Sequence, residues 1–179
     1  MNFLEALFRR LFGPAQSVPK VAPITGKARI AIGGLALSAA ALVGLTTYEG
    51  WSDKAYVPVP GDVPTIGFGT TEGVKLGDTI KPPQALQRAL TDVQKFEGAI
   101  KQCVTVPLHQ AEYDAYTSLA YNIGSGAFCR STLVTKLNAL DYAGACEQIL
   151  VWDKFKGQPL RGLTLRREKE HEQCVGASK

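Results

Sequence analysis

The hydrophobic and polar positions of this 179-residue chain follow two different patterns. Residues 30–47 form one apolar run without a charged side chain, which predicts a single apolar helix. As a helix, these 18 residues would extend about 27 Å, just enough to cross the hydrocarbon core of a membrane. From residue 82 onward, apolar residues recur every three to four positions, which is typical of amphipathic helices that pack in a soluble domain.

The apolar run is weakly hydrophobic for a membrane anchor. Seven of its residues are Ile, Leu or Val, and the other eleven are Ala, Gly, Ser or Thr, which contribute little to insertion. We therefore favour a signal-anchor that can leave the membrane again. Three alternatives stay open: a signal peptide cleaved near the alanines at 39–41, a permanent anchor, and a buried helix of a soluble protein.

All of the excess positive charge precedes the apolar run. Residues 1–29 hold five basic side chains and one acidic one, whereas residues 48–179 hold fifteen of each. This asymmetry is expected of a basic tail kept on the cytoplasmic side of a membrane. Within the tail, residues 1–13 predict a short amphipathic helix, and residues 14–26, with three prolines, predict a linker. The electrically neutral remainder argues against a nucleic-acid partner.

Four cysteines, Cys103, Cys129, Cys146 and Cys174, all follow the apolar run. An even number in an exported domain predicts two disulfide bonds, for which three pairings are possible, although unpaired buried thiols are an alternative. The cysteines form no C-x-x-C motif, and neither histidine has a ligand partner at helical spacing. We therefore expect no metal site and no cofactor.

The part of the chain after the apolar run predicts an α+β domain. Residues 55–69 contain three prolines and three glycines among β-branched and aromatic residues, which predicts a β-hairpin or small sheet with tight turns. Helices are expected from Pro82, over 108–123 and 131–140, from a cap at Asp141 through Trp152, and after a cap at Thr164. We expect a small sheet lobe and a larger helical lobe with a cleft between them, preceded by the apolar helix.

Glu49 lies two residues after the apolar run. A carboxyl at the end of a largely apolar helix is poorly solvated, which favours its protonated form and suits a general acid. Thr65, in the predicted hairpin, has a hydroxyl that could hold a water molecule opposite this acid. An acid and a positioned water are the minimum for inverting hydrolysis of a glycosidic bond. A surface or helix-capping role for Glu49 is the more ordinary alternative.

Several motifs resemble the phage-type lysozymes, the glycoside hydrolases that bacteriophages use as endolysins. The matching segments are Glu49-Gly50, Ala55-Tyr56, Pro64-Thr65-Ile66-Gly67-Phe68-Gly69, 121–128, Ser131-Thr132-Leu133, Lys136-Leu137-Asn138 and 157–168. They occur in the family's order and cover residues 48 to about 175. The apolar front end further resembles the signal-anchor-release (SAR) subclass, in which a weak N-terminal anchor holds the enzyme at the inner membrane until it slips out.

The resemblance implies an organisation and a function. Residues 1–29 would be a cytoplasmic tail and linker, 30–47 a weak transmembrane signal-anchor, and 48–179 a lysozyme-like catalytic domain. The enzyme would be a muramidase that hydrolyses the β-1,4 bond between N-acetylmuramic acid and N-acetylglucosamine in peptidoglycan, and thereby lyses the host cell. It is expected to be a monomer, to need no cofactor, and to stay inactive at the host inner membrane until its release to the periplasm.

Site residues follow by position within the matching segments. Glu49 corresponds to the general acid, and Thr65 to the residue that positions the attacking water. The family also has an acid between these two, but its expected position falls on Pro58 or Val59 here. Asp62 is the nearest acid and the candidate replacement, with ordinary turn chemistry in Pro-Gly-Asp as the alternative. Residues that the resemblance places along the sugar-binding groove are Tyr56, Phe68, Tyr121 and Thr132.

The missing acid motivates an alternative from another class, a non-catalytic, membrane-tethered protein that binds peptidoglycan on a degenerate lysozyme fold. Three arginines near the C-terminus, Arg161, Arg166 and Arg167, could meet the acidic peptides of the cell wall or could form a solvated or salt-bridged helix face. We favour the enzyme, because the resemblance covers both Glu49 and Thr65.

Overall fold

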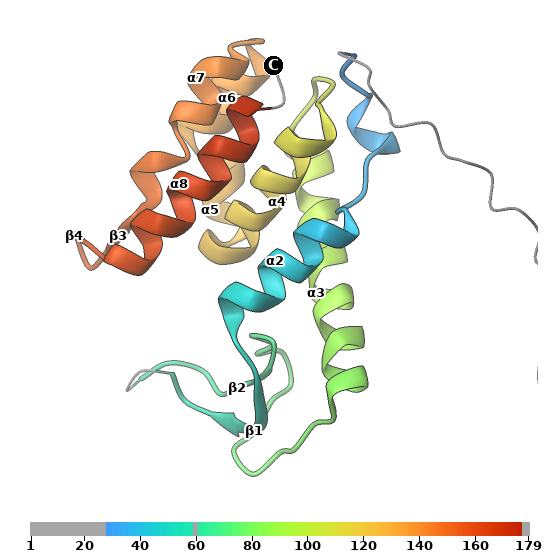
Figure 1. Ribbon diagram of the computed structural model, residues 1–179, viewed down its shortest axis with the longest axis vertical. Coiled ribbons are helices and arrows are strands. Elements are labelled where there is room, and N and C mark those ends of the chain that lie inside the picture. The colour runs from blue at the N-terminus through green and yellow to red at the C-terminus, as the bar shows by residue number, and fades with distance from the viewer. Residues whose placement is uncertain (1–27, 59–60, 177–179) are drawn as a thin grey trace, which may run out of the picture.

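The computed structural model describes residues 28–58 and 61–176. The amphipathic helix and the linker expected at 1–13 and 14–26 therefore lie outside the described residues. Two lobes make up the described part of the molecule, a small one with two strands and a larger helical one, and a long helix reaches from one to the other (Figure 1). The predicted α+β division into a sheet lobe and a helical lobe is confirmed.

The small lobe is built on an antiparallel pair of strands, β1 (Ser52–Tyr56) and β2 (Thr65–Gly67), which pair with an irregular register. At Gly67, φ is +67°, and a Cβ there would lie 2.9 Å from the side chain of an alanine in helix α3 (Pro82–Cys103). Glycine therefore lets β2 lie directly against α3. The hairpin predicted over 55–69 is confirmed, with β1 beginning slightly earlier.

Helix α3 is the connection between the lobes (Figure 1). It begins at a Pro-Pro pair, where the missing N–H groups would have had no partner within the helix. Its buried face includes Ala89, Val93 and Ile100, as the periodicity predicts. The same face carries the buried carboxylate of Glu97, which accepts a hydrogen bond of 2.7 Å from the Tyr113 hydroxyl. A polar residue on this face is therefore tolerated because it is paired.

The larger lobe gathers the remaining helices around α4. Its elements are α4 (Gln110–Ile123), α5 (Ser125–Cys129), α6 (Thr132–Asn138), α7 (Tyr142–Glu147), the 3₁₀ turn η2 (Leu150–Trp152), the hairpin strands β3 (Lys154–Phe155) and β4 (Gln158–Pro159), and α8 (Arg161–Gly176). Asp141 caps α7 by accepting a 2.9 Å hydrogen bond from the Gly144 N–H, as predicted. The predicted cap at Thr164 is wrong, because the Thr164 N–H already makes a helical bond of 2.9 Å to the Leu160 carbonyl.

Two disulfide bonds join helices of the larger lobe. Cys103–Cys129 links the end of α3 to α5, and Cys146–Cys174 links α7 to α8. The prediction of two disulfides is confirmed, and among the three possible pairings the structure has the one that joins cysteines neighbouring in sequence. Both bridges border the apolar core of this lobe.

The single apolar helix expected over 30–47 does not form in this structure. A short 3₁₀ turn, η1 (Ile32–Gly34), is followed by an extended stretch, and helix α2 (Ala39–Glu49) begins only after Ser38, whose hydroxyl accepts from a backbone N–H of the first turn. Within the described residues, no helix combines the length and the apolar composition that crossing a membrane requires.

The interruption of this helix has a physical cause in the helical lobe. The N–H of Leu37 donates to the carboxylate of Glu97 at 2.8 Å, and the N–H of Ser38 donates to that of Asp114 at 3.0 Å. Both carboxylates are buried, so each needs such donors. The backbone between η1 and α2 is extended because its N–H groups bind these carboxylates instead of helical carbonyls.

The beginning of the described chain is also attached to the helical lobe. Arg29 forms a two-pronged ion pair with the buried carboxylate of Glu112, with a shortest distance of 2.7 Å. Ile30 and Leu108 exchange backbone hydrogen bonds of 2.7 and 2.9 Å, and Leu35 enters the apolar core. The segment from 28 to 49 thus lies folded against the domain.

Candidate active site

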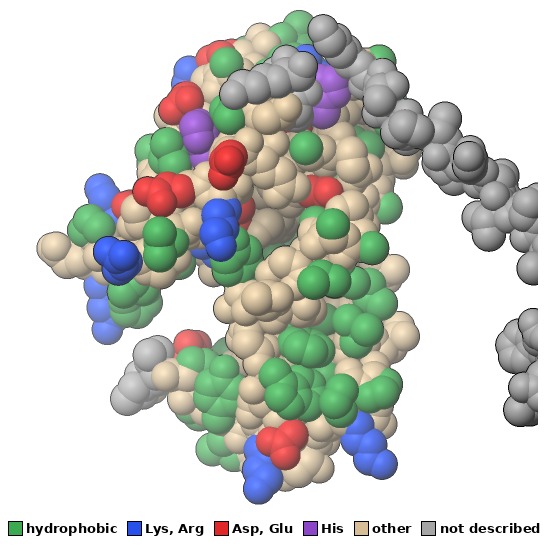
Figure 2. All heavy atoms as spheres, in the orientation of Figure 1, with side chains coloured by type: hydrophobic (Ala, Val, Ile, Leu, Met, Phe, Trp, Pro, Cys, Tyr) green, Lys and Arg blue, Asp and Glu red, His purple; other side chains and the backbone are tan. Residues whose placement is uncertain are grey.

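A cleft of about 370 Å³ is formed by elements of both lobes, and Figure 2 shows the molecular surface hollowed between them. Its walls come from the end of α2, the segment after β2, helix α3, and the junction of α4 and α5. The residues that line it are Glu49, Gly69, Thr71, Glu72, Asp92, Lys95, Phe96, Tyr121, Asn122 and Ser125. The predicted cleft between the lobes is confirmed.

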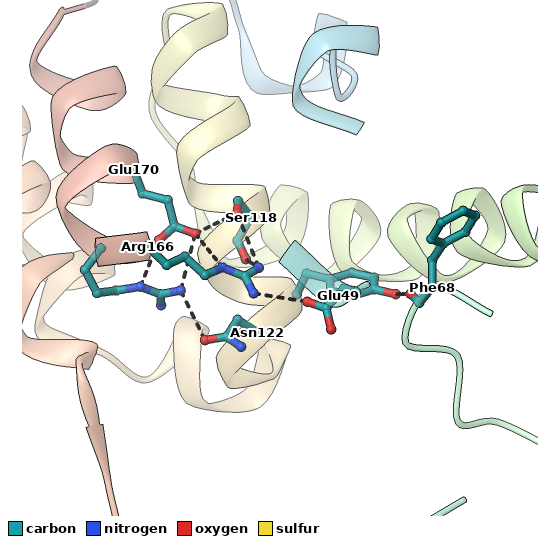
Figure 3. Close-up of polar contacts among 8 residues, drawn as sticks. Glu49, Phe68, Ser118, Asn122, Arg166 and Glu170 are labelled. Atoms are coloured by element: carbon teal, nitrogen blue, oxygen red, sulfur yellow. Dashed lines mark hydrogen bonds and ion pairs between the residues drawn. The ribbon is translucent and has the colours of Figure 1, made fainter. Parts of the chain in front are cut away.

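Glu49 is the last residue of α2, and its side chain is 21% exposed at this cleft. Its Oε1 lies 3.0 Å from Nη1 of Arg166 (Figure 3). Its Oε2 has no hydrogen-bond partner among the described residues and packs against Gly69. At Gly69, φ is +87°, and a Cβ would lie 2.9 Å from Oε2. Glycine at this position therefore makes room for the carboxylate.

The surroundings of Glu49 differ from the purely apolar ones that the sequence predicted. Arg166 is 5% exposed and Arg167 is fully buried, whereas Arg161 is exposed. Arg166 therefore faces inward to the site. Of the alternatives that the sequence left open for Arg166 and Arg167, the structure has the salt-bridged one, with ion pairs to Glu49 and Glu170. The reason is that Arg166 lies within α8 at a point where α8 packs on α4, next to the end of α2.

Thr65 and Asp62 lie in the hairpin, and neither is among the residues that line the cleft. Thr65 is 7% exposed, and its hydroxyl donates to the Val63 carbonyl over a long 3.3 Å. Asp62 is exposed, and its carboxylate accepts a 2.8 Å hydrogen bond from the N–H of Val63. Among the described residues, Asp62 makes no hydrogen bond or ion pair to Glu49 or Thr65. Its contact in the structure is that of a turn residue.

The four residues assigned to the sugar groove are placed differently. Tyr121 lines the cleft, and its hydroxyl donates to the Phe68 carbonyl at 3.4 Å. The Phe68 ring lies 5.1 Å from that of Trp51, centroid to centroid. Tyr56 is an exposed residue of β1, and Thr132 is exposed at the start of α6. The structure thus brings Phe68 and Tyr121 together, but of these four residues it places Tyr121 alone in the lining of the cleft.

The hydroxyl of Tyr121 keeps its proton at neutral pH. Burial raises the pKa of this phenol, and the nearby carboxylates of Glu49 and Asp92 raise it further. Tyr121 is therefore a hydrogen-bond donor in the same cleft as these two acidic side chains.

A polar wall of the cleft was not predicted from the sequence. Asp92 of α3 accepts a 2.7 Å hydrogen bond from the Thr70 hydroxyl, and Lys95, one turn further, pairs with Glu72. The available signal was that Asp92 and Lys95 stand at helical spacing beside the apolar face of α3. Within the described residues, no cluster of His, Cys, Asp and Glu is arranged to hold a metal ion.

Comparisons with known proteins agree with this architecture. A family model described as phage lysozyme matches residues 46–170. The SAR-endolysin of Pseudomonas phage phiKMV is 39% identical over 144 residues, which cover 78% of this chain and 89% of the relative.

Solved structures show the same likeness. The endolysin from Escherichia coli O157:H7 phage FAHEc1 matches with a TM-score of 0.71 and 35% identity, covering 80% of this chain and 95% of that one. The active form of the P1 phage endolysin Lyz matches with a TM-score of 0.69 and 25% identity, covering 84% and 97%. Because the family model and the phiKMV SAR-endolysin each match more than half of its length, this chain belongs to the phage lysozyme family and is a lysozyme-type glycoside hydrolase.

Proposed function

We propose that this chain is an endolysin that hydrolyses the β-1,4 bond between N-acetylmuramic acid and N-acetylglucosamine in peptidoglycan and thereby lyses the bacterial host. The observation that carries the proposal is the geometry of Glu49. One oxygen is fixed by Arg166 at 3.0 Å, and the other is free of hydrogen bonds within the described residues and lies at the cleft. A carboxyl held in this way can present a proton to an oxygen atom in the cleft.

In the proposed reaction, Glu49 protonates the glycosidic oxygen as the bond to the sugar breaks. Thr65 positions the attacking water. Its hydroxyl donates to the Val63 carbonyl, which leaves the oxygen lone pairs free to accept a hydrogen bond from water. The Tyr121 hydroxyl donates a 3.4 Å hydrogen bond to the Phe68 carbonyl, which holds the end of the β2 segment against the helical lobe. The spacing between the two sides of the site is thereby fixed.

Asp62 remains the candidate for the family acid that is missing between Glu49 and Thr65. Its exposure and its hydrogen bond to the Val63 N–H favour the turn role. For Asp62 to act on the water, its carboxylate would have to leave this turn when substrate binds. The contribution of Asp62 can therefore be measured directly by substitution.

The test is clearing of purified peptidoglycan by wild-type protein and by three isosteric or small variants. Glu49→Gln is expected to lose activity by about 10²- to 10⁴-fold, because the glutamine amide cannot transfer a proton to the glycosidic oxygen. Thr65→Ala is expected to lose less. Asp62→Asn is expected to stay within about twofold of wild type if Asp62 is a turn residue, and to fall with Thr65→Ala if it acts on the water.

Circular dichroism and thermal melts of each variant provide the control for folding. If the wild-type protein binds peptidoglycan but neither it nor Glu49→Gln releases sugar products, the chain is instead the non-catalytic binding protein considered from the sequence. Analysis of the new reducing ends identifies which glycosidic bond is cut. Release of N-acetylglucosamine reducing ends would contradict the proposed bond.

We further infer that the segment at 30–47 is a signal-anchor in the host inner membrane, with the N-terminus in the cytoplasm, and that the structure corresponds to the released form in the periplasm. The relative named SAR-endolysin and the match to an active endolysin support this. The docking contacts of Arg29, Leu37 and Ser38 with carboxylates cannot form while the segment lies in lipid.

Release would therefore assemble the site. With 30–47 in a bilayer, Glu49 is drawn to the membrane interface and away from Arg166. All four cysteines are paired outside the apolar run, so activation needs no disulfide exchange with this run. Fractionation of expressing cells should find the protein in the membrane first and in the periplasm later, and a protein that is periplasmic from the start would contradict the inference.

A further inference from the structure

Arg166 is shared between two carboxylates. Its Nη1 lies 3.0 Å from Glu49, and its Nε lies 3.2 Å from Oε1 of Glu170, one helical turn further along α8. Its Nη2 donates to the Ser118 carbonyl at 3.2 Å, and Figure 3 shows the guanidinium lying between the two acids. The aromatic ring of Tyr48 lies 4.9 Å from the guanidinium carbon. The arginine is therefore fixed on several sides and can hold Glu49 in one place.

Glu170 is buried, with 3% of its surface exposed. Its Oε1 accepts a 2.6 Å hydrogen bond from the Ser118 hydroxyl, and its Oε2 lies 3.0 Å from Nε of Arg167. Burial raises the pKa of the Glu170 carboxyl above its ordinary value, although Arg167, Ser118 and Arg166 each act to lower it. The carboxylate form of Glu170 has both guanidinium groups as partners, at 3.2 Å from Arg166 and 3.0 Å from Arg167, so its negative charge lies behind Arg166.

Arg166 and Arg167 carry two positive charges, and Glu170 is the carboxylate that both guanidinium groups contact. When Glu49 is protonated, Glu170 still supplies a negative charge beside them. A lone arginine beside Glu49 would strongly favour loss of the proton that a general acid must keep. A carboxylate on the other side of the same arginine weakens this effect, because part of the guanidinium charge is already neutralised.

We propose that Glu170 is a positioning residue for the glycosidase reaction, which holds Arg166 against Glu49 and offsets enough of its charge for Glu49 to retain a proton at the pH of catalysis. The proposal rests on the proposed function in that Glu49 is taken as the acid. Glu170 acts through Arg166, since among the described residues it makes no contact with Glu49 itself.

Other titratable groups face the two carboxylates from neighbouring elements. Around Glu49 these are Tyr121 of α4, Asp92 and Lys95 of α3, and Glu72 after β2; near Glu170 and Arg166 they are Tyr48 of α2, Asp114 of α4, and Arg167 and Lys169 of α8. Substituting Glu170 leaves all of them in place. A change in the pH dependence of the reaction can therefore be assigned to the charge behind Arg166.

The experiment compares the pH profile of kcat/KM on soluble peptidoglycan fragments for wild type, Glu170→Gln and Ser118→Ala. Glu170→Gln should move the alkaline limb of the profile to lower pH by about one unit. At pH values above this limb its kcat/KM should be about tenfold below that of wild type, and at lower pH the two should become equal. Ser118→Ala removes a hydrogen bond to Glu170 without removing charge, and its limb should stay in place. Equal loss at every pH for Glu170→Gln would show a merely structural role and overturn the proposal.

A second measurement keeps the proposal testable if activity is lost. The carboxyl carbon of Glu49 can be followed by NMR titration, with Glu49→Gln used to assign it. Glu170→Gln should shift its midpoint to lower pH, Arg166→Met should shift it to higher pH, and the double variant should match Arg166→Met. Independent shifts that simply add would contradict an action through Arg166.

If Glu170→Gln does not fold, Glu170→Asp withdraws the carboxylate by one methylene and should move the midpoint in the same direction by less; an unchanged midpoint would overturn the proposal. If the midpoints shift as expected while no variant, including wild type, cuts peptidoglycan, the link through Arg166 stands and the proposed function fails.

Discussion

The helical lobe and the front segment at 28–49 are held in place by different kinds of interaction. The helical lobe packs a continuous apolar core around α4 and is joined by two disulfides. The front segment contributes two buried apolar side chains, Leu35 and Leu45, and a partly buried one, Ile32. It is otherwise attached through hydrogen bonds and an ion pair, most of them to buried carboxylates of α3 and α4. One region is fixed by covalent bonds and packing, and the other is docked.

This difference matters because the candidate active site is divided between the two regions. Glu49 ends the front segment, whereas Arg166 and Tyr121 belong to the helical lobe. The carboxylate reaches these partners only when the front segment is docked. A change that loosens the docking should therefore abolish activity without unfolding the lobe, and a change in the lobe should affect both.

Among the changes considered, reduction of both disulfides is expected to have the largest effect on the stability of the helical lobe. The bridges join cysteines separated by 26 and 28 residues, and loops of this size are each stabilised by about 3 to 4 kcal/mol on an entropic account. The melting temperature of the lobe should fall by roughly 20 °C or more in a reductant. Calorimetry with and without dithiothreitol measures this, and a shift of only a few degrees would mean that the apolar core alone fixes the lobe.

Truncation of Leu45 should act on the docked region. Leu45 is 1% exposed in α2, and Leu45→Ala is expected to weaken the docking by about 2 to 5 kcal/mol. Activity should fall steeply while the main thermal transition of the lobe moves little. Val43→Ala, in the same helix at a side chain that is 65% exposed, is the matched control and should change neither. If Leu45→Ala lowers activity only in proportion to the melting temperature, the two regions unfold together and the comparison is wrong.

Alkaline pH should lower the free energy of unfolding of the helical lobe, and the loss per titrating tyrosine should be smaller than the effects of the two preceding changes. Burial raises the pKa of Tyr113, Tyr116 and Tyr121 above the ordinary value near 10. The folded state therefore binds these protons more tightly than the unfolded state. The stabilisation is fully present below pH 10 and is lost as pH rises above it, by about 1.4 kcal/mol per pH unit for each tyrosine.

Denaturant titrations between pH 8 and 11 check this slope. In Tyr116→Phe the decline should be shallower by the contribution of one tyrosine. Among the described residues, the polar partners of the Tyr116 hydroxyl are the sulfur atoms of Cys146 and Cys174, so its removal breaks no stronger hydrogen bond. A slope that does not change in Tyr116→Phe would contradict the assignment.

Local patterns account for much of the fold. The periodicity from Pro82 onward gave the positions of α3 and α4, and the turn residues of 55–69 indicated the hairpin. The cap at Asp141 was visible because capping depends on neighbouring residues only. The break in the apolar run was not visible, because it depends on Glu97 and Asp114, which come from other helices far along the chain.

The candidate site was predictable only in part for the same reason. Glu49 could be identified from a motif, but its partner Arg166 lies 117 residues later, and no local pattern relates the two. Glu170 is one of several charged residues in the sequence of α8, and only its burial in the folded lobe makes it a partner of Arg166. Long-range pairs of charges are fixed by tertiary packing, which a single sequence does not display.

If the front segment controls the site by leaving the membrane, as proposed, then glycine substitutions that strengthen the anchor should keep the protein inactive. Added side chains at Gly33 and Gly44 would meet no atom within 4 Å in the folded protein, so Gly33→Leu with Gly44→Leu strengthens membrane insertion without obstructing the docked form. Gly98→Leu, at an equally open position in α3, is the control.

Lysis timing and membrane fractionation are measured for the double variant, the control and wild type expressed in host cells. The double variant should stay in the membrane fraction and lyse the cells late or not at all, while Gly98→Leu should behave as wild type. Release of the double variant into the periplasm and lysis on the wild-type schedule would contradict the proposed control of the site.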